Sequence, residues 1–540
     1  NYRFSEHLKA SMNVGYNLSI NDQQAIVPVS SLNPTSSLEA TRGQARSDSE
    51  NWSLEPQLDY QHGLLGGRLN VLLGGTFHAT SGSTLRIDAS GFPSDESLRR
   101  LNNALNINVN ESSSHYKYLA VFGRLNYNLQ NTFLLNITAR RDGSSRFGPN
   151  KRFSNFGALG MGWIFSNTID FSNTLPWISF GKIRGSIGFT GNDKIPDYQY
   201  LDTWAVNNNF RYPQLSTQFL YPDKLFNPEY HWESTRKTEV ALEIGLFNDR
   251  VMFSPVYFLN SSENQLVNYQ LPRMTGFNNV IANLPATVIN AGFEFTLSSS
   301  NVERKDFSWQ TDFNLSVPRN KLKAFPDIEN SSYYTTYVVG QPLNVIYTYD
   351  FTGVDPETGN PTFRDVNQDG TINTDDYVPS GTLDPKFYGG LQNTVIYKNF
   401  QLDFFFQFRK TIGGNYLRFN PQGQGDYHNW PIVDTKVWEK PGDIAKLPKL
   451  IAVNTTEHNN FRKSNAIYSD ASYLQLNNAS LSYRIPGAVT ERWGISTLRI
   501  YVLGQNLWTI TGYEVGDPTI QSYLSTPPLR TITGGFQLIF

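Results

Sequence analysis

The chain has no cysteine, so it contains neither a disulfide framework nor a thiolate metal site. It also lacks any run near the roughly 18 consecutive apolar residues that a membrane-spanning helix needs, since apolar runs such as residues 71–73 are short. The formal net charge is −2, and no block of Lys or Arg provides a phosphate-binding surface. These absences exclude a helical membrane protein and make nucleic acid an unexpected partner.

Sequence motifs of common enzymes are missing as well. The chain has no H-E-x-x-H, no G-x-S-x-G and no G-x-x-x-x-G-K, and its seven histidines are scattered. Glu243, Glu294 and Asp403 lie on the polar sides of alternating segments, where two carboxylates could pair as in a glycosidase. Charged groups lining a wet surface are the simpler explanation, and no enzymatic activity is expected.

The residues that are present indicate a β-rich chain with many turns. Aromatic residues make up 14% and charged residues 17%, while the mean hydropathy is −0.41. A strand that faces lipid on one side only never builds a long apolar run. The negative hydropathy is therefore compatible with a membrane β-barrel.

Apolar and polar residues alternate with period two from end to end of the chain. In the clearest case, Phe occupies nearly every second position from Phe400 to Phe408, opposite Gln401 and Asp403. The pattern predicts about sixteen antiparallel strands, which begin near residues 8, 52, 69, 117, 133, 154, 178, 237, 251, 286, 307, 389, 400, 473, 498 and 530.

The connections between these segments alternate between short and long. Tight turns are predicted at residues 129–132, 247–250 and 397–399, and long polar loops near 20–51, 79–116, 190–236, 318–388 and 410–472. Outer-membrane barrels have short periplasmic turns and long extracellular loops. A soluble sandwich gives no reason for long loops at every second connection, so the alternation favours a transmembrane barrel.

Both ends of the chain are informative. The last ten residues, TITGGFQLIF, alternate up to the terminal Phe540 and resemble the assembly signal of bacterial outer-membrane proteins. The first residues, NYRFSEHL, have neither an initiator Met nor a signal sequence. We therefore expect a processed N-terminus or a fragment.

Several short blocks resemble successive segments of SusC/RagA-type TonB-dependent transporters. They are RDGSSRFG at 141–148, GMGW at 160–163, RGSIGFTGN at 184–192, DVNQDG at 365–370, PKFYGGL at 385–391, YLQL at 473–476, GQNL at 504–507 and the ending at 530–540. The resemblance covers essentially all of residues 1–540. It implies the later part of a twenty-two-stranded outer-membrane barrel whose plug and first strands are absent here.

The resemblance also implies a function. It indicates import of oligosaccharides or peptides with a SusD-like surface lipoprotein, driven by the TonB complex through a plug that this chain lacks, and a pair of importers side by side. The isolated sheet would have open edges that lipid cannot satisfy. Two alternatives stay open: a plugless passive pore, and a soluble carbohydrate-binding β-protein.

One long loop contains a calcium-like motif, DVNQDGTINTDD at 365–376. Oxygen donors at the first, third and fifth positions, Gly370 at the sixth, a carbonyl at the seventh and a carboxylate at the end match what a hard cation requires. An Asx-rich turn selects the same residue types. The proposed structural Ca²⁺ ligands are Asp365, Asn367, Asp369, Thr371, Asn373 and Asp376.

Aromatic residues cluster in the long connections. Tyr333, Tyr334 and Tyr337 form one cluster, and Tyr427 and Trp430 belong to another. Exposed rings could contact a sugar or, as the resemblance suggests, a partner protein. An aromatic girdle at the membrane boundary, or packing among the loops, is the competing explanation.

Overall fold

The computed structural model describes residues 1–540 except 34, 36, 172, 208–218, 272, 420–436, 452, 454, 523 and 524. In this part of the chain, seventeen strands form one large sheet with antiparallel pairing. Sixteen of them correspond to the sixteen predicted segments, and the other is a two-residue strand at the N-terminus. The predicted all-β fold class is confirmed.

The strands of the large sheet are β1 (Tyr2–Arg3), β2 (Leu8–Val27), β3 (Thr41–Leu64), β4 (Gly67–Ser90), β5 (Asn106–Leu129), β6 (Phe133–Ser144), β7 (Phe153–Trp163), β8 (Ile178–Asn192), β11 (Glu233–Leu246), β12 (Val251–Gln270), β13 (Asn279–Arg304), β14 (Phe307–Ala324), β19 (Phe387–Tyr397), β20 (Phe400–Lys410), β23 (Tyr473–Ile485), β24 (Thr497–Thr511) and β25 (Thr531–Ile539).

Four two-stranded sheets lie in the connections: β9 (Thr203–Asn207) with β10 (Phe219–Lys224), β15 (Val345–Thr348) with β18 (Val378–Thr382), β16 (Phe351–Val354) with β17 (Pro361–Phe363), and β21 (Ile412–Gly414) with β22 (Tyr468–Asp470).

The helices are short. The α-helices are α1 (Tyr416–Phe419), α2 (Thr456–Phe461) and α3 (Gly487–Thr490), and the 3₁₀ turns are η1 (Val29–Ser31), η2 (Ser97–Arg99), η3 (Leu101–Asn103), η4 (Phe165–Asn167), η5 (Arg273–Thr275), η6 (Ile328–Asn330), η7 (Thr374–Asp376), η8 (Asn465–Ile467) and η9 (Glu491–Trp493). Among the described residues, no helix has the length and apolarity to cross a membrane.

The predicted tight turns are confirmed. Between β5 and β6, Gln130 and Asn131 both have positive φ, and the Thr132 N–H donates to the Leu129 carbonyl at 2.9 Å. Two central residues with positive φ match the right-handed twist of the flanking strands. Lys398 takes the same conformation in the turn between β19 and β20.

The predicted loops at 20–51 and 79–116 were placed too widely. The first connection is residues 28–40 and the second is residues 91–105, because β2 to β5 continue through most of both predicted loops. The extension of β3 carries polar residues on both sides, as in Arg46 and Ser47, so it shows no apolar face. Backbone hydrogen bonds to β2 and β4 hold it in the sheet without one.

The other predicted loops contain structure of their own. The connection expected at 190–236 includes β9 and β10, the one at 410–472 includes β21, β22 and α2, and the one at 318–388 includes β15 to β18, while β14 continues to Ala324. These strands are only three to six residues long, so the alternation of apolar and polar residues within them is too brief to predict a strand from the sequence.

The chain divides into two compact units. The first contains residues 1–161, 187–236 and 264–284, and the second contains 162–186, 237–263 and 285–540.

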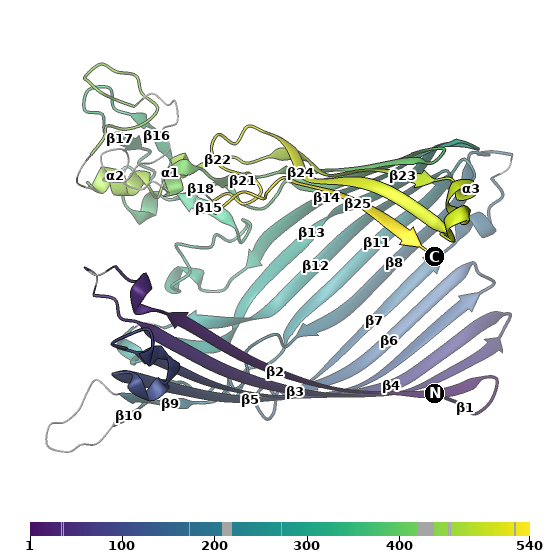
Figure 1. The fold of residues 1–540 in the computed structure, drawn as a ribbon, viewed down its shortest axis with the longest axis horizontal. Helices are drawn as coiled ribbons and strands as arrows, with labels where there is room; N and C mark the ends of the chain where they lie inside the picture. Colours follow the sequence, from purple (N-terminus) through teal and green to yellow (C-terminus); the bar gives the residue numbers. More distant parts are fainter. Residues whose placement is uncertain are drawn as a thin grey trace. The chain divides into compact units, whose positions relative to one another are not determined.

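In the first unit, β2 to β5 run side by side and pair over nearly their whole lengths (Figure 1). Cross-strand partners share a face, so the register defines one apolar face across the four strands. It includes Met12, Leu54, Leu73 and Val121, of which Val121 is 63% exposed. Aromatic residues flank this band on β3, Tyr60 at one end and Trp52 at the other, roughly the 9–11 residues with which a tilted strand crosses a bilayer.

The far ends of the two hairpins of this unit are joined by a small core. Ala40, Ala89, Phe92 and Leu98 are buried together, with Leu32, Leu101 and Ala104 packed against them. The Arg42 guanidinium donates to the carbonyls of Leu98 and Arg99 at 2.9 and 2.8 Å. This core packs Leu32 and Ala40 from the first hairpin against Phe92 and Leu98 from the second.

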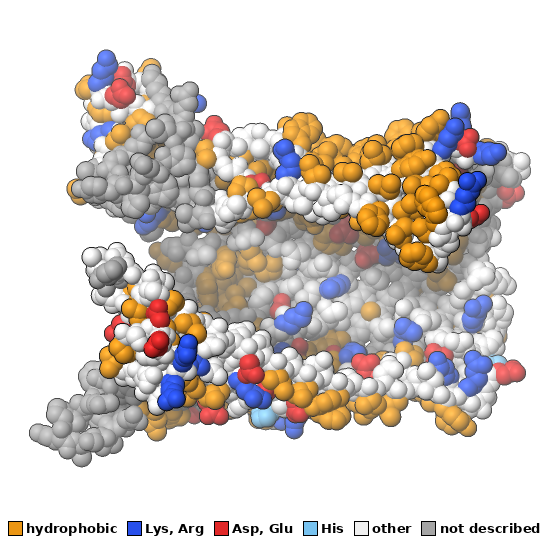
Figure 2. Space-filling view, viewed as in Figure 1, with side chains coloured by type: hydrophobic (Ala, Val, Ile, Leu, Met, Phe, Trp, Pro, Cys, Tyr) orange, Lys and Arg blue, Asp and Glu red, His pale blue; other side chains and the backbone are white. Residues whose placement is uncertain are grey.

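In the second unit, β13, β14, β19, β20, β23, β24 and β25 pair in succession. Phe536 of β25 lies opposite Ile500 of β24, which lies opposite Tyr483 of β23. Figure 2 shows hydrophobic side chains gathered over β24 and β25. The short elements β15 to β18, α1 and α2 lie at one end of these strands, and α3 lies at the other (Figure 1).

Candidate functional site

The face of β2 to β5 opposite the apolar band is lined mainly by polar side chains, most of them Ser, Thr, Asn and Gln on β2 to β4. Its positions run from Ser11 to Asn21 on β2, Ser47 to Gln57 on β3, Gly74 to Thr84 on β4 and Ser112 to Phe122 on β5, taking every second residue. Among these positions Glu55 is the one Asp, Glu, Lys or Arg. We call this surface the polar wall.

Hydrogen bonds between neighbouring strands order the side chains of the polar wall. The Thr80 hydroxyl donates to Asn51 Oδ1 at 2.7 Å, and the Ser47 and Thr84 hydroxyls lie 3.0 Å apart. On the adjoining strand β6, Arg140 is neutralised by Asp142, with Nε 2.5 Å from Oδ1. The polar wall therefore offers hydrogen-bond donors and acceptors from hydroxyl and amide groups, and it carries little net charge.

The RDGSSRFG block places Arg146 in a network of interactions beside this wall. Its Nε lies 2.8 Å from Asp197 Oδ1, and its Nη1 donates to the Asp193 carbonyl at 3.0 Å. The guanidinium carbon lies 4.1 Å from the centre of the Tyr116 ring, whose hydroxyl donates to Asp193 Oδ2 at 2.7 Å. Arg146 thus ties the β6–β7 connection to the segment after β8.

The next residue of the block, Phe147, is fully buried. It packs against Tyr230 and Trp232, with ring centres 5.8 and 5.0 Å away, and the Trp232 indole donates to the Arg152 carbonyl at 2.9 Å. A Cβ on Gly148 would lie 2.5 Å from the Pro228 carbonyl oxygen, so glycine is needed there for the close approach. The block and the aromatic residues before β11 together form a structural core.

In the second unit, Arg184, the first residue of the family-like segment at 184–192, belongs to a charge network. Lys182 Nζ and Arg184 Nε lie 3.1 and 3.0 Å from Glu243 Oε1, and Arg184 also pairs with Glu239. Asp403 is paired differently: it accepts from the Thr394 hydroxyl at 2.8 Å and from the Gln401 amide at 2.9 Å. Sequence reasoning identified Glu243 and Asp403 as polar-face carboxylates but not their partners, of which Lys182, Arg184 and Thr394 come from other strands.

The calcium-like loop is closed by its own hydrogen bonds. Asp376 has no exposed surface, and its two oxygens accept from the N–H groups of Val366 at 2.7 Å and Asn373 at 3.0 Å. Asp365 accepts from Gln368 and Gly370 at 2.7 and 2.9 Å. The bond from Asn373 is the main reason that the pKa of Asp376 is lowered.

These bonds are those of an Asx-rich turn with a capping box at η7. The oxygens of Asn367, Asp369 and Asn373 also accept from backbone N–H groups within the loop. Across the described residues, no three His, Asp or Glu side chains are grouped so that they could hold a metal ion. The calcium site, with Thr371 as a carbonyl ligand, stays a prediction.

The predicted aromatic contacts fall in two places. Tyr333 and Tyr337 are half-buried and stack with ring centres 5.8 Å apart, and Tyr333 also packs on Phe325 at 6.0 Å. Tyr334 is exposed. Tyr427 and Trp430 lie outside the described residues, and the role of these residues in ligand or partner contact stays a prediction.

The fold and its two faces define a class. A large antiparallel sheet with one apolar, aromatic-flanked face and one polar face is typical of an outer-membrane β-barrel. The chain belongs to the TonB dependent receptor-like, beta-barrel family, whose model matches residues 1–507. It is therefore an outer-membrane protein of that family.

Individual relatives agree. The chain is 28% identical to TonB-dependent receptor P3 of Formosa agariphila over 90% of its own length and 52% of that protein. It is 27% identical to TonB-dependent receptor SusC of Bacteroides thetaiotaomicron over 76% of its length and 42% of that protein. The chain thus spans about half the length of these curated relatives.

A solved structure of the RagAB peptide transporter matches the fold with a TM-score of 0.86. The match covers 99% of this chain and 60% of that chain at 22% sequence identity. The resemblance to SusC/RagA-type proteins inferred from the sequence blocks is confirmed.

Proposed function

We propose that this chain forms the barrel region of a SusC-like importer that brings oligomeric nutrients, preferably neutral glycans, across the outer membrane. The polar wall is the observation that carries the proposal. Its hydroxyl and amide groups form a continuous polar surface on the face opposite the apolar band. Such a surface gives a hydrophilic solute a path across a layer that otherwise excludes it.

The chemistry of the wall favours glycans over peptides. Sugars present many hydroxyl groups that donate and accept, as do Ser, Thr and Asn side chains. Peptides carry charges at their termini and often on their side chains, and charges entering a narrow site need countercharges. The wall offers Glu55 alone, since Arg140 is already paired with Asp142.

Membership of the TonB dependent receptor-like, beta-barrel family also suggests which partners the protein has. We propose that a SusD-like surface lipoprotein captures the glycan at the long connections, and that the TonB complex supplies energy through a plug region outside residues 1–540. Two importers would work side by side. The names of two relatives, TonB-dependent receptor P3 and TonB-dependent receptor SusC, support the part of the proposal that concerns TonB.

Uptake by cells provides the test. The whole protein is expressed in a strain that lacks its gene, and uptake of labelled neutral oligosaccharides is compared with uptake of oligopeptides of similar size. We expect oligosaccharide uptake that stops when a protonophore removes the proton gradient. Uptake that persists with the protonophore would instead establish a passive pore, and a preference for peptides would contradict the substrate assignment.

A further inference from the structure

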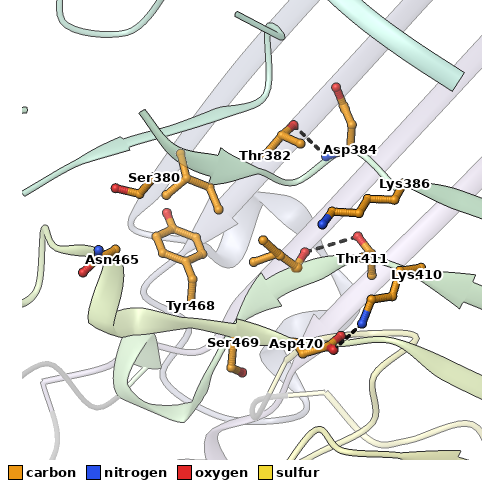
Figure 3. Close-up of a pocket in the computed structure, with 12 residues that line it drawn as sticks. Ser380, Thr382, Asp384, Lys386, Lys410, Thr411, Asn465, Tyr468, Ser469 and Asp470 are labelled. Atoms are coloured by element: carbon orange, nitrogen blue, oxygen red, sulfur yellow. Dashed lines mark hydrogen bonds and ion pairs between the residues drawn. The ribbon is translucent and has the colours of Figure 1, made fainter. Parts of the chain in front are cut away.

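The cations of a cavity in the second unit need no further partner. Figure 3 shows Lys410 beside Asp470, and the Lys410 Nζ lies 2.5 Å from Asp470 Oδ2. Lys386, which also lines the cavity, is exposed to water, and a hydrated ammonium group is stable without a counter-ion. A cation indicates a ligand more strongly where it faces lipid, and the first unit contains such a cation.

Arg141 of β6 lies on the face of the sheet that carries the apolar band. Its cross-strand partner is Val121 of that band. The Arg141 guanidinium carbon lies 5.3 Å from the centre of the Phe153 ring, and Nη1 donates to Asn155 Oδ1 at 3.1 Å. Phe153 and Asn155 of β7 are both exposed, so the guanidinium is held on the outer surface.

The apolar band ends at Arg141. On this face, the first charged residue beyond the band is Glu50 on β3, Lys117 on β5 and Arg141 on β6, where Ile137 and Ala139 precede it. The β5–β6 connection is a tight turn, and tight turns are periplasmic. Arg141 therefore lies at the extracellular boundary of the band, where the headgroups of the outer leaflet begin.

No described carboxylate neutralises Arg141. Its chain neighbour Arg140 faces the polar wall and pairs with Asp142, whereas Arg141 forms no ion pair with a described residue. A charged side chain beside lipid is costly unless its end reaches the headgroup layer, and an arginine side chain is long enough to do so. The groups that Arg141 meets there are those of the lipid.

The row of cross-strand partners that contains Arg141 leads to a groove in the apolar band. The row runs from Arg141 through Val121 to Gly75, and a Cβ added to Gly75 would lie 3.7 Å from the Pro56 side chain. The groove has a volume of about 590 Å³. Its lining is mostly apolar and includes Ala10, Met12, Pro56, Leu58, Leu73 and Gly75.

The two ends of this row lie at different depths because the strands are tilted. On β3, Pro56 is midway between Trp52 and Tyr60, the aromatic residues that flank the band, whereas on β6 Arg141 stands at the limit of the band. A lipid whose headgroup is held at Arg141 can therefore direct an acyl chain down into the groove.

We propose that this surface binds a phosphate-bearing lipid of the outer leaflet. The phosphate accepts hydrogen bonds from the Arg141 guanidinium, whose planar fork of donors suits phosphate oxygens. One acyl chain crosses Val121 and lies in the groove over Gly75. A lipid without phosphate leaves Arg141 unpaired, and a free phosphate gains nothing from the groove. The inference does not depend on which solute is imported.

Lipid binding by the purified whole protein in detergent tests the proposal. Phosphatidic acid is titrated and bound lipid is measured by native mass spectrometry. Diacylglycerol with the same chains is the probe without phosphate, and glycerol 3-phosphate is the probe without chains. We expect phosphatidic acid to bind about tenfold more tightly than either.

Three variants locate the site. Arg141→Met should weaken binding of phosphatidic acid about tenfold, because the cation is lost. Gly75→Leu should also weaken it by filling the groove, and the new Cβ has room, since its nearest neighbours lie at 3.4 and 3.7 Å. Arg86→Met, on the other face of β4, is the matched control and should leave binding unchanged.

Each part of the proposal has an outcome that would overturn it. Equal binding of diacylglycerol, or an unchanged Arg141→Met variant, would remove the role of the phosphate. Equally tight binding of glycerol 3-phosphate would show a site for free anions instead of a lipid site. Unchanged binding in Gly75→Leu would show that the acyl chain does not occupy the groove.

Discussion

The guanidinium carbon of Arg146 lies 4.1 Å from the centre of the Tyr116 ring, while its Nε pairs with Asp197 at 2.8 Å. A residue between β6 and β7 thereby joins β5 to the segment that follows β8. Both members of the ion pair are largely buried, with side chains 23% and 18% exposed. Arg146 is therefore a structural link rather than a surface charge.

Replacing this arginine should destabilise the first unit. Arg146→Met leaves Asp197 without its partner and removes the cation from the Tyr116 ring, so we expect a loss of about 2–3 kcal/mol in the free energy of unfolding. Urea unfolding of the protein in micelles measures it. The matched control is Arg86→Met, whose pair with Asp88 is exposed and should contribute less than about 0.5 kcal/mol. Equal effects of the two variants would contradict the structural role.

A charge on the apolar band should be far more costly than one on the polar wall. Val121 lies near the middle of the band on β5, and Val121→Arg should cost about 2–4 kcal/mol because the new charge faces lipid. Thr76→Arg, on the polar wall next to Gly75, which is the cross-strand partner of Val121, should change stability by about 0.5 kcal/mol or less. The measurement is reversible folding into lipid vesicles, and a reversed order would mean that the two faces have been assigned wrongly.

Removal of the Asp376 carboxylate should open the loop that precedes β18. Asp376→Ala leaves the N–H groups of Val366 and Asn373 without acceptors, and each lost bond costs about 1–3 kcal/mol. We expect hydrogen exchange at these two amides to accelerate at least tenfold. Asp375→Ala is the control, since the Asp375 side chain makes no hydrogen bond to a described residue. Unchanged exchange in the Asp376 variant would refute the role of the capping box.

Hydrogen exchange at the amides of Val366 and Asn373 also tests whether the loop binds calcium. If the loop binds the ion as the sequence predicts, adding calcium to chelator-treated protein will slow their exchange, and Asp365→Ala will abolish the effect. Equal exchange with and without calcium would leave the Asx-rich turn as the full explanation of this motif.

Acid should release the contact between Lys410 and Asp470. The Lys410 ammonium, followed by the Ser472 hydroxyl, lowers the pKa of Asp470 from 3.8 to about 2. Because the folded pKa lies below the unfolded one, the stabilisation is complete above about pH 4 and is lost as the pH falls toward 2. An NMR titration of the Asp470 carboxyl measures this, and Lys410→Met should bring its pKa back toward 3.8. An unchanged pKa in that variant would contradict the assignment.

Much of the sheet could be predicted because alternation is a local signal. The starts of β19, β20 and β23 fall within two residues of their predictions, since Phe400 and Phe404 mark an apolar face directly. The start of β3 was placed near residue 52 instead of Thr41. Between these positions both faces are polar, so period-two hydrophobicity carries no information there, and hydrogen bonds to β2 and β4 maintain the strand.

The interactions between side chains were harder to predict from the sequence, because the residues that make them are distant in the chain. Arg146 and Asp197 are 51 residues apart, and the motif that contains Arg146 does not identify its partner. Glu243 likewise stands out on a polar strand face, but its partners Lys182 and Arg184 are 61 and 59 residues away in the chain.

The extension of β2 to β5 past Trp52 has a practical consequence. Some eleven residues of each strand, tilted by about 40°, raise the ends of the hairpins roughly 25–30 Å above the apolar band. Leu38 and Leu105 are 70% and 80% exposed there. A peptide epitope grafted next to either residue would be displayed well clear of the lipid surface, on a support that includes the Phe92 core.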